Sequence, residues 1–245
     1  MIKGKYPYFK QKTVEERDCF PNLNMTPAAL LVLVQEVSSG HLEALGYDYF
    51  RLLDEKIVFM LSSVAVRFFR TPVLGERITA ATCPAGAEGA HMMRETVILD
   101  EDENILAEAQ ASWIMLSTEN GRILRPREFP IELPTLKEYT PFTEVWKLKI
   151  PEKGDFKEER KILLSDLDRN HHMNNTVYAS VITDLFPQEV MEKDIREISI
   201  KYKKQVKLGN TLSLYTHREE DTIYINARED NELYFQGSIT LDKKV

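Results

Sequence analysis

The chain has 245 residues, of which 43% are hydrophobic and 29% are charged. These fractions are typical of a soluble globular protein and argue against a disordered, collagen-like or membrane-embedded chain. The formal net charge of -7 argues against wholesale binding of nucleic acid, which usually goes with a basic chain.

Two cysteines, Cys19 and Cys83, are too few for a disulfide scaffold, and we expect both thiols to be free. The N-terminal stretch MIKGKYPYFKQK lacks the apolar run of a signal peptide, and the longest apolar run, Ala28 to Val34, is too short to span a bilayer. A cytoplasmic protein without membrane insertion is therefore expected. No Cys/His cluster has the spacing of metal ligands, so neither a metal nor another cofactor is expected.

The first predicted element is a buried helix over residues 27–45. Thr26 is a suitable cap, Pro27 suits the first helical position, and Gly46 suits the end. The first half of this helix is apolar nearly all round, which indicates burial rather than a surface position.

Strands follow the helix. The segments VFMLSSVAVRFF, RITAATCPAG, HMMRETVILD and ILAEAQASWIMLS are rich in β-branched and aromatic residues and are separated by turn residues. This pattern predicts an antiparallel meander. The next segment, PREFPIELPTLKEYTP, holds four prolines and is interpreted as a linker.

The second half repeats this plan. A strand at KILLSD precedes a helix predicted from about Asn175 to Leu185 and ended by Pro187, and four strand candidates follow. Residues 198–209 match residues 64–75 without a gap at their aromatic, basic and Leu-Gly positions. We therefore expect an α+β protein of two tandem units, residues 1–134 and 140–245.

A polar motif, SDLDRNHHMNNTVY at residues 165–178, stands immediately before the second helix. It offers a carboxylate, an amide and an imidazole at alternate positions, which in an extended loop would point to one side: Asp168, Asn170 and His172. Such a set can activate water and hold a thioester. Asn174 or Asn175 can cap the helix, whose N-terminus favours a developing oxyanion. Polar runs at this place are also common as simple caps and Asx-turns.

The motif resembles the D-x-N-x-H-V-N-N-x-x-Y signature of acyl-acyl carrier protein (acyl-ACP) thioesterases, and the chain looks like a bacterial relative of the plant fatty acyl-ACP thioesterases. The first helix, the FFRTPVLGE turn, the ASWIML strand, the linker and the IKYKKQVKLG strand occur in matching order. The resemblance implies a tandem double hotdog fold, in which antiparallel sheet wraps two long helices. It also implies an acyl-binding first unit, a catalytic second unit and hydrolysis of fatty acyl-ACP to fatty acid and holo-ACP.

By this resemblance the catalytic positions are Asp168, Asn170 and His172, with Asp168 as general base or as nucleophile. A further polar position falls on Gln205, where plant members carry Glu, and Val206 replaces their Cys. This difference argues against a thiol mechanism at that place. Gln205 can orient water by hydrogen bonding but cannot act as a base, and it is otherwise a plain strand residue.

Two further sets of residues are candidates for binding. An acidic partner such as ACP needs a local basic surface, for which the candidates are Arg169, Arg196, Lys201, Lys203, Lys204 and Lys207. These side chains are equally consistent with solvated strand positions. The acyl chain needs an apolar channel, for which the candidates are Phe59, Met60, Phe68, Met92, Trp113 and Met115, each of which also fits an ordinary core.

Two other functions stay open at this point: an acyl-CoA thioesterase and a non-catalytic hotdog protein that binds acyl groups or ACP. The sequence contains no G-x-S-x-G elbow and no Gly-rich phosphate-binding loop, which argues against an α/β-hydrolase and a nucleotide-binding protein. A homodimer that pairs through exposed sheet edges is a further candidate assembly.

Overall fold

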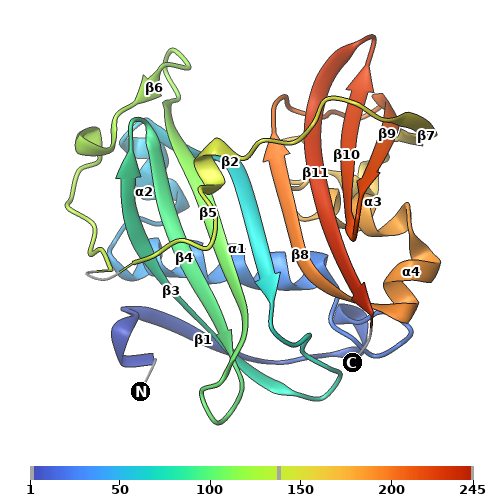
Figure 1. Cartoon of the computed structure of the whole chain (residues 1–245). Coiled ribbons are helices and arrows are strands. Elements are labelled where there is room, and N and C mark those ends of the chain that lie inside the picture. The colour runs from blue at the N-terminus through green and yellow to red at the C-terminus, as the bar shows by residue number, and fades with distance from the viewer. Residues whose placement is uncertain (1–2, 137–138, 244–245) are drawn as a thin grey trace.

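One antiparallel sheet of 11 strands runs through the protein, as the computed structural model of residues 3–136 and 139–243 shows (Figure 1). From one edge to the other the order is β1-β3-β4-β5-β2-β8-β11-β10-β9-β7, and β6 pairs with β5. The first-half strands are β1 (Tyr8–Thr13), β2 (Ile57–Phe68), β3 (Arg77–Glu88), β4 (His91–Leu99), β5 (Ile105–Ser117) and β6 (Ile123–Leu124). The second-half strands are β7 (Asp155–Lys161), β8 (Lys193–Tyr202), β9 (Thr211–Glu219), β10 (Thr222–Glu229) and β11 (Glu232–Lys243).

The two halves are related by a pseudo-twofold axis at the centre of this sheet. The strand order from β1 to β2 is repeated in reverse from β8 to β7. Strands β2 and β8 pair with each other, and Ala65 lies opposite Ser199. These two residues are equivalent in the repeat of 64–75 and 198–209, so each half contacts the corresponding surface of the other. The tandem repeat is thereby confirmed.

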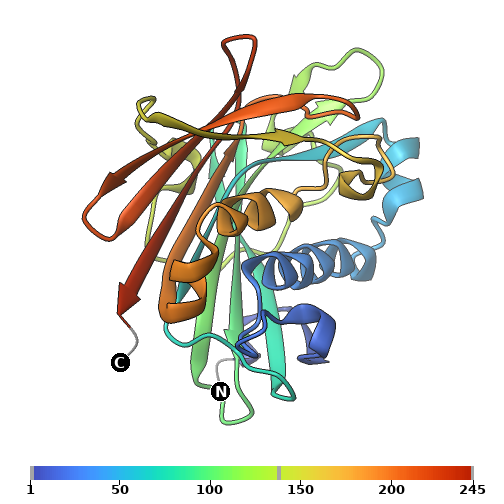
Figure 2. The ribbon, with the colours of Figure 1, turned by 90° about the vertical axis from the view of Figure 1, so that its right-hand side faces the viewer.

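Both units place a helix on the same face of the sheet (Figure 2). Helix α1 (Pro27–Ala44) begins as predicted, with the Thr26 hydroxyl oxygen accepting from the Ala29 N–H at 3.0 Å. It stops before Gly46, whose φ of 86° suits glycine. A short helix, α2 (Tyr49–Asp54), follows it.

The second unit departs from the expected pair of long helices. Helix α3 (Val177–Asp184) has only 8 residues, and Pro187 begins a separate helix, α4 (Pro187–Glu192). The proline ends the first segment because it has no N–H to donate to the preceding turn. The α+β arrangement of helices on one antiparallel sheet is confirmed, but the second helix is short.

A single main core fills the space between the sheet and the helices. It includes Leu30 and Leu33 of α1, Ile182 of α3, and Ile198 and Ile200 of β8, all at most 1% exposed. Because one sheet and one core run through both halves, the division into units 1–134 and 140–245 stays a prediction. Among the described residues, no helix has both the length and the apolar character needed to cross a bilayer.

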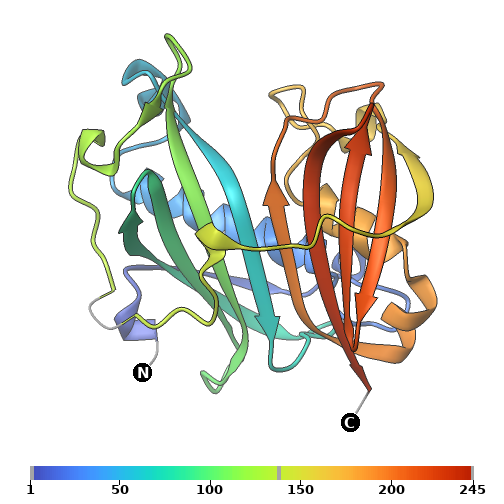
Figure 3. The same ribbon diagram turned by 45° about the horizontal axis from the view of Figure 1, so that its top comes forward.

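The segment between the two units crosses the sheet face opposite the helices (Figure 3). Its backbone is held by polar side chains of both units: Ser63 Oγ donates to the Val145 carbonyl at 2.6 Å, and Gln236 Nε2 donates to the Ile150 carbonyl at 3.0 Å. Each bond satisfies a buried side chain that would otherwise lose its hydrogen bonds to water. The stretch that follows the predicted linker is therefore fixed to both halves.

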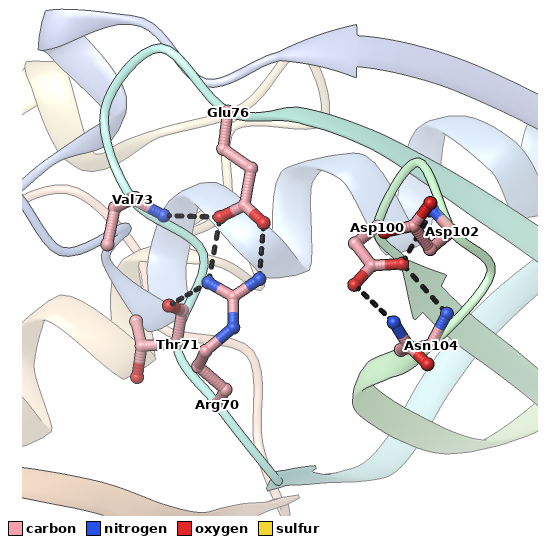
Figure 4. A network of polar contacts seen from close by, with 7 residues as sticks. All are labelled: Arg70, Thr71, Val73, Glu76, Asp100, Asp102 and Asn104. Carbon is pink, nitrogen blue, oxygen red and sulfur yellow. Dashed lines mark hydrogen bonds and ion pairs between the residues drawn. The ribbon is translucent and has the colours of Figure 1, made fainter.

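A polar network holds the turn that leads from β2 to β3 (Figure 4). The Glu76 carboxylate accepts from both terminal nitrogens of Arg70, and its Oε2 also accepts from the Val73 N–H at 3.0 Å. In the neighbouring hairpin, Asp100 Oδ1 accepts from the Asn104 N–H at 2.8 Å. These bonds satisfy turn backbone that the sheet leaves unpaired.

One prediction concerns the carboxyl of Glu95 on β4. Burial, and then the negative charge of Glu108, raises the pKa of Glu95 to about 7. Because this pKa is higher in the folded than in the unfolded state, the folded state binds the proton more tightly. The free energy of unfolding should therefore fall as the pH rises from about 4.5 through about 7. We expect the melting temperature of Glu95→Gln to change less than that of the wild type between pH 5 and 8. A control, Glu101→Gln in the hairpin loop, should follow the wild type, and parallel curves for all three proteins would contradict this.

Candidate active site

The catalytic motif folds as a tight turn. The Asp168 N–H donates to the His172 carbonyl at 2.8 Å, the His171 N–H donates to the Asp168 carbonyl at 3.1 Å, and His171 has a φ of 61°. This is the geometry of a three-residue hairpin loop with one left-handed residue. The expectation of an extended loop is therefore wrong, and alternate side chains of the motif are not obliged to point to one side.

The Asp168 carboxylate is fixed by this turn. Its Oδ1 accepts from the backbone N–H of Asn170 at 2.8 Å and, more weakly, from that of His172 at 3.4 Å. Its Oδ2 lies 3.5 Å from Asn170 Nδ2. The carboxylate thus acts as the Asx cap of the turn through one oxygen, while its other oxygen has only this one long contact among the described residues.

A cavity of about 1020 Å³ connects this motif to the first unit. Its walls carry apolar side chains of β2, β4, β5, α2 and the segment after β6, among them Phe59, Met92, Trp113, Leu52, Phe129, Ile131 and Leu133. Residues of the second unit close the same cavity: Asp168, Arg169, Asn170, Asn174 and Asn175. Polar side chains of α1, among them Gln35, Ser39 and Glu43, also line it, so apolar and polar groups meet in one cavity, as they do in small-molecule sites.

The structure brings two of the four candidate catalytic side chains to this cavity. Asp168 and Asn170 line it, whereas His172 and Gln205 do not. His172 pairs through its backbone with Lys207, and Gln205 is exposed beside Val206, whose carbonyl accepts from the motif's Met173 N–H at 2.8 Å. Of the three side chains expected to converge, Asp168 and Asn170 therefore meet at the cavity, and His172 lies outside its lining.

The start of α3 differs by one or two residues from the expectation. Thr176 is its N-cap, and Asn174 Oδ1 accepts from both the N–H and the hydroxyl of Thr176 at 3.0 Å. The Asn175 carbonyl accepts from the Tyr202 hydroxyl at 2.9 Å. Asn174 therefore forms an Asx-turn before the helix rather than capping its first turn, but both asparagines still line the cavity.

Tyr178, the last residue of the motif, to which sequence reasoning assigned no role, is buried and close enough to Asp168 to feel its charge. Burial, followed by the negative charge of Asp168, raises the pKa of Tyr178 above its ordinary value, so the phenol is neutral at pH 7. The Tyr178 ring makes edge contacts with Tyr202 and Phe235, each at a centroid distance of 4.9 Å. The tyrosine of the recognised motif was the available signal.

The candidate acyl-binding residues divide into two groups. Phe59, Met92 and Trp113 line the cavity, and Met115 is fully buried in the cluster directly behind its wall. Two expectations are corrected. Met60 is 40% exposed because strand alternation turns it to the face opposite Phe59. Phe68 belongs to the main core, because it lies beyond a bulge between Leu61 and Ser63 at the far end of β2.

Sequence reasoning missed one wall of the cavity. Residues 126–135, interpreted as part of a linker, contribute Phe129, Ile131 and Leu133, and α2 contributes Tyr49 and Leu52. The alternation of apolar residues at 129, 131 and 133 was a signal for a buried extended segment. The prolines between them obscured it.

Four of the basic candidates lie near the motif. Arg169 lines the cavity, with its guanidinium 3.8 Å from the centre of the Tyr49 ring. Lys203, Lys204 and Lys207 are exposed in the turn after β8, and Lys204 pairs with Glu232.

The other two basic candidates have structural contacts elsewhere. Lys201 donates to the Leu148 carbonyl at 2.7 Å and so holds the segment between the units. Arg196, near the opposite end of β8 from the motif, pairs with Asp242 at 3.3 Å. The expected basic surface is therefore divided, and only its part near Lys203 and Lys207 adjoins the motif.

The first unit contains the same turn with different side chains. The Phe20 N–H donates to the Asn24 carbonyl at 2.9 Å, and Leu23 has a φ of 68°. By this correspondence Phe20 occupies the place of Asp168 and Asn24 that of His172. The chain therefore carries one acidic copy of the turn, not two.

A buried aspartate anchors each copy. Asp166 Oδ2 accepts from the Leu163 N–H at 2.8 Å, and its Oδ1 pairs with Arg160 at 2.8 Å. In the first unit, Asp18 pairs with Lys12 at 2.8 Å and accepts from the Glu15 N–H at 2.9 Å.

These matched anchors allow a controlled test. Asp166→Ala should lower the free energy of unfolding by about 1–3 kcal/mol, because it leaves a buried N–H and a charge without their partner. It should also lower kcat, because the Asp168 turn loses its support. Asp18→Ala should lower stability to a similar extent but keep kcat close to the wild-type value well below its melting temperature. Thermal denaturation and turnover assays check both, and equal kcat values for the two variants would contradict the assignment.

Comparison with known proteins places the chain in a family. The sequence matches the acyl-ACP thioesterase N-terminal domain over residues 8–129 and the C-terminal domain over residues 151–243. No curated protein sequence matches the chain.

Two solved structures share the fold over nearly the whole chain. An acyl-ACP thioesterase from Bacteroides thetaiotaomicron superimposes with a TM-score of 0.84 at 18% identity, covering 99% of this chain and 100% of that one. The 12:0-ACP thioesterase from Umbellularia californica superimposes with a TM-score of 0.78 at 14% identity, covering 96% and 97%. With both family domains present in order on this hotdog-type fold, the chain belongs to the acyl-ACP thioesterase family and is a thioester hydrolase.

Proposed function

We propose that the protein hydrolyses the thioester of fatty acyl-ACP and releases a free fatty acid and holo-ACP. The observation that carries this proposal is the shared cavity, in which apolar walls of the first unit meet Asp168 and Asn170 of the second. An acyl chain held by those walls would present its thioester to the only motif copy that carries an acid. The chemistry thus depends on both halves of the chain.

Asp168 is proposed as the residue that starts the reaction. As general base, Oδ2 takes a proton from water, whose oxygen attacks the thioester carbonyl carbon. The carbon–sulfur bond then breaks, the acid is released, and the proton passes to the leaving thiolate. As nucleophile, the same oxygen would attack the carbonyl carbon, the carbon–sulfur bond would break, and an acyl anhydride would form; water then hydrolyses the anhydride, which restores the Asp168 carboxylate, releases the fatty acid and supplies the proton that the thiolate takes up. In both routes Oδ1 keeps its backbone hydrogen bonds and the turn stays intact.

The neighbouring residues are proposed to position the reactants. Asn170 Nδ2, near the reacting oxygen of Asp168, is suited to orient water. The Asn174 N–H donates to the Asp166 carbonyl at 2.8 Å, so of this pair it is the Asn175 N–H that is proposed to stabilise the oxyanion, an effect usually worth about 100- to 1,000-fold per donor. His172 acts on Asp168 through its backbone N–H. Gln205 would have to turn its exposed side chain toward the cavity to orient water.

ACP is proposed to dock beside the turn after β8. Lys203 and Lys207 are exposed there, and Lys207 pairs by its backbone with the motif. In a chain of net charge -7, such a local basic surface is what an acidic carrier requires. Acyl-CoA is the competing carrier, because its phosphates would meet the same cations.

The first test removes the charge of Asp168 and keeps its turn. Asp168→Asn retains an oxygen that accepts from the Asn170 N–H, so the melting temperature should stay close to the wild-type value. The loss of the base should lower kcat by about 100-fold or more. Thiol release from acyl-ACP measures turnover. Turnover at the wild-type rate in a folded Asp168→Asn protein would contradict the proposal.

The second test addresses the carrier. Lys203→Glu and Lys207→Glu should raise KM for acyl-ACP and weaken its salt dependence, because they remove attraction between exposed charges. KM for an acyl-pantetheine thioester, which lacks the carrier protein, should hardly change. Arg196→Glu, near the other end of β8, is the matched control. If acyl-CoA has the higher kcat/KM, or if Arg196→Glu has the same effect as Lys203→Glu, the assignment to ACP fails.

A further inference from the structure

A buried arginine lines the cavity. Arg94 of β4 is only 7% exposed, yet it belongs to the cavity wall. Burial lowers its pKa to about 10, so the guanidinium is still charged at pH 7. Within the described part of the chain, no carboxylate forms an ion pair with it. Burying a cation without a counterion costs free energy of folding, because the charge loses its hydration and gains no ion pair.

The protein satisfies only part of this guanidinium. Arg94 Nη1 donates to His41 Nδ1 at 3.1 Å and lies 3.4 Å from Thr82 Oγ1. Burial, and then the charge of Arg94, lowers the pKa of His41 to about 4, so this histidine is neutral at pH 7 and accepts the bond. Among the described residues, Nε and Nη2 of Arg94 have no hydrogen-bond partner.

A second unused donor lies next to Arg94. The indole Nε1 of Trp113 is buried, and the described residues provide no partner for it. Trp113 of β5 lies opposite Met92, and Arg94 lies opposite Ala111, so Arg94 and Trp113 are diagonal neighbours on one face of the sheet. Diagonal neighbours are about 7–8 Å apart, within reach of long and aromatic side chains. Both residues line the cavity.

These two donors point to a ligand that brings an acceptor. A plain alkyl chain offers no lone pair, so its entry would take water away from the free nitrogens of the guanidinium and leave the indole N–H as unsatisfied as it is now. A chain with an oxygen function brings an acceptor to this pair of donors. Sites built to hydrogen-bond a substrate group discriminate strongly against analogues that lack it, because the buried groups are then left unpaired.

We propose that the cavity selects acyl chains that carry a hydroxyl, keto or carboxylate oxygen, and that Arg94 and Trp113 bind this oxygen as specificity-determining residues. This inference rests on the proposed thioesterase function and names its substrate class. Arg94 recognises the chain and takes no part in the cleavage of the thioester, which stays with Asp168.

The experiment compares four ACP thioesters of one chain length: decanoyl, 3-oxodecanoyl, 3-hydroxydecanoyl and 9-carboxynonanoyl. For the wild type, we expect kcat/KM for at least one oxygenated substrate to exceed that for decanoyl-ACP by about 10-fold or more. The substrate with the highest value identifies the oxygen function. In Arg94→Met, which keeps a long unbranched side chain without donors, this ratio should fall toward one.

Two further variants make the comparison decisive. Arg77→Met makes the same change on the exposed part of β3 and should keep the wild-type ratio. Trp113→Phe should lower the ratio even if Arg94→Met does not fold. The inference is overturned if the wild type prefers decanoyl-ACP, or if Arg94→Met lowers kcat/KM for all four substrates equally, as a structural role would.

A binding assay separates this inference from the proposed function. In a Trp146→Phe background Trp113 is the sole tryptophan, and its fluorescence can report the binding of free decanoate and 3-hydroxydecanoate, 3-oxodecanoate or decanedioate. Tighter binding of an oxygenated acid, lost in Arg94→Met, supports the selectivity even if no thioester is hydrolysed. Equal binding of all four acids would overturn it, even if decanoyl-ACP is a good substrate.

Discussion

The pairing of β2 with β8 is the contact on which the rest of the structure depends. It joins two antiparallel sheets edge to edge and places Ala65 opposite its own counterpart, Ser199. Because the two central strands are paired, neither leaves an open edge to solvent. The same pairing brings the motif turn of the second unit to the cavity walls that the first unit forms. Without this pairing, the turn that carries Asp168 and the apolar walls of the cavity would lie on two units that are not held together.

The two units differ in the length of their helices and in how the space beneath them is filled. Helix α1 has 18 residues, whereas α3 has 8. In the second unit, Ile182 of α3 packs directly over Gly237, so the space beneath that helix is filled by core. The first unit has the long helix and the apolar walls of the cavity, but Phe20 occupies the place that Asp168 occupies in the second unit. The first unit therefore supplies the apolar walls, and the second unit supplies the carboxylate.

Sequence reasoning could predict the features that depend on local chemistry. The cap at Thr26, the end of α1 before Gly46 and the interruption at Pro187 follow from backbone preferences that neighbouring residues cannot change. The repeat was visible because buried strands need the same side-chain types in both copies. The recognised motif identified Asp168 and Asn170, and their place at the cavity agrees with the role that the resemblance implies.

Features that depend on backbone conformation in turns and strands, or on tertiary contacts, could not be predicted from the sequence. Nothing in the residue types shows that His171 takes a left-handed conformation, which closes the motif into a tight turn instead of an extended loop. The bulge after Leu61 shifts the alternation of β2. The wall formed by Phe129 and its neighbours appeared to be a linker, because its prolines are as compatible with a loop as with a buried extended segment.

The presence of Phe20 and Asp168 at matching places has a consequence for how such a protein can change. In an assembly of identical subunits, every substitution appears on both sides of the symmetry axis. A substitution that widens the cavity of one subunit therefore widens the cavity of its partner as well. Here the symmetry is only approximate, because one polypeptide encodes both sides. A substitution in the cavity wall of the first unit therefore changes that unit alone. The range of substrates can change in this way without any change in the second unit, which carries Asp168.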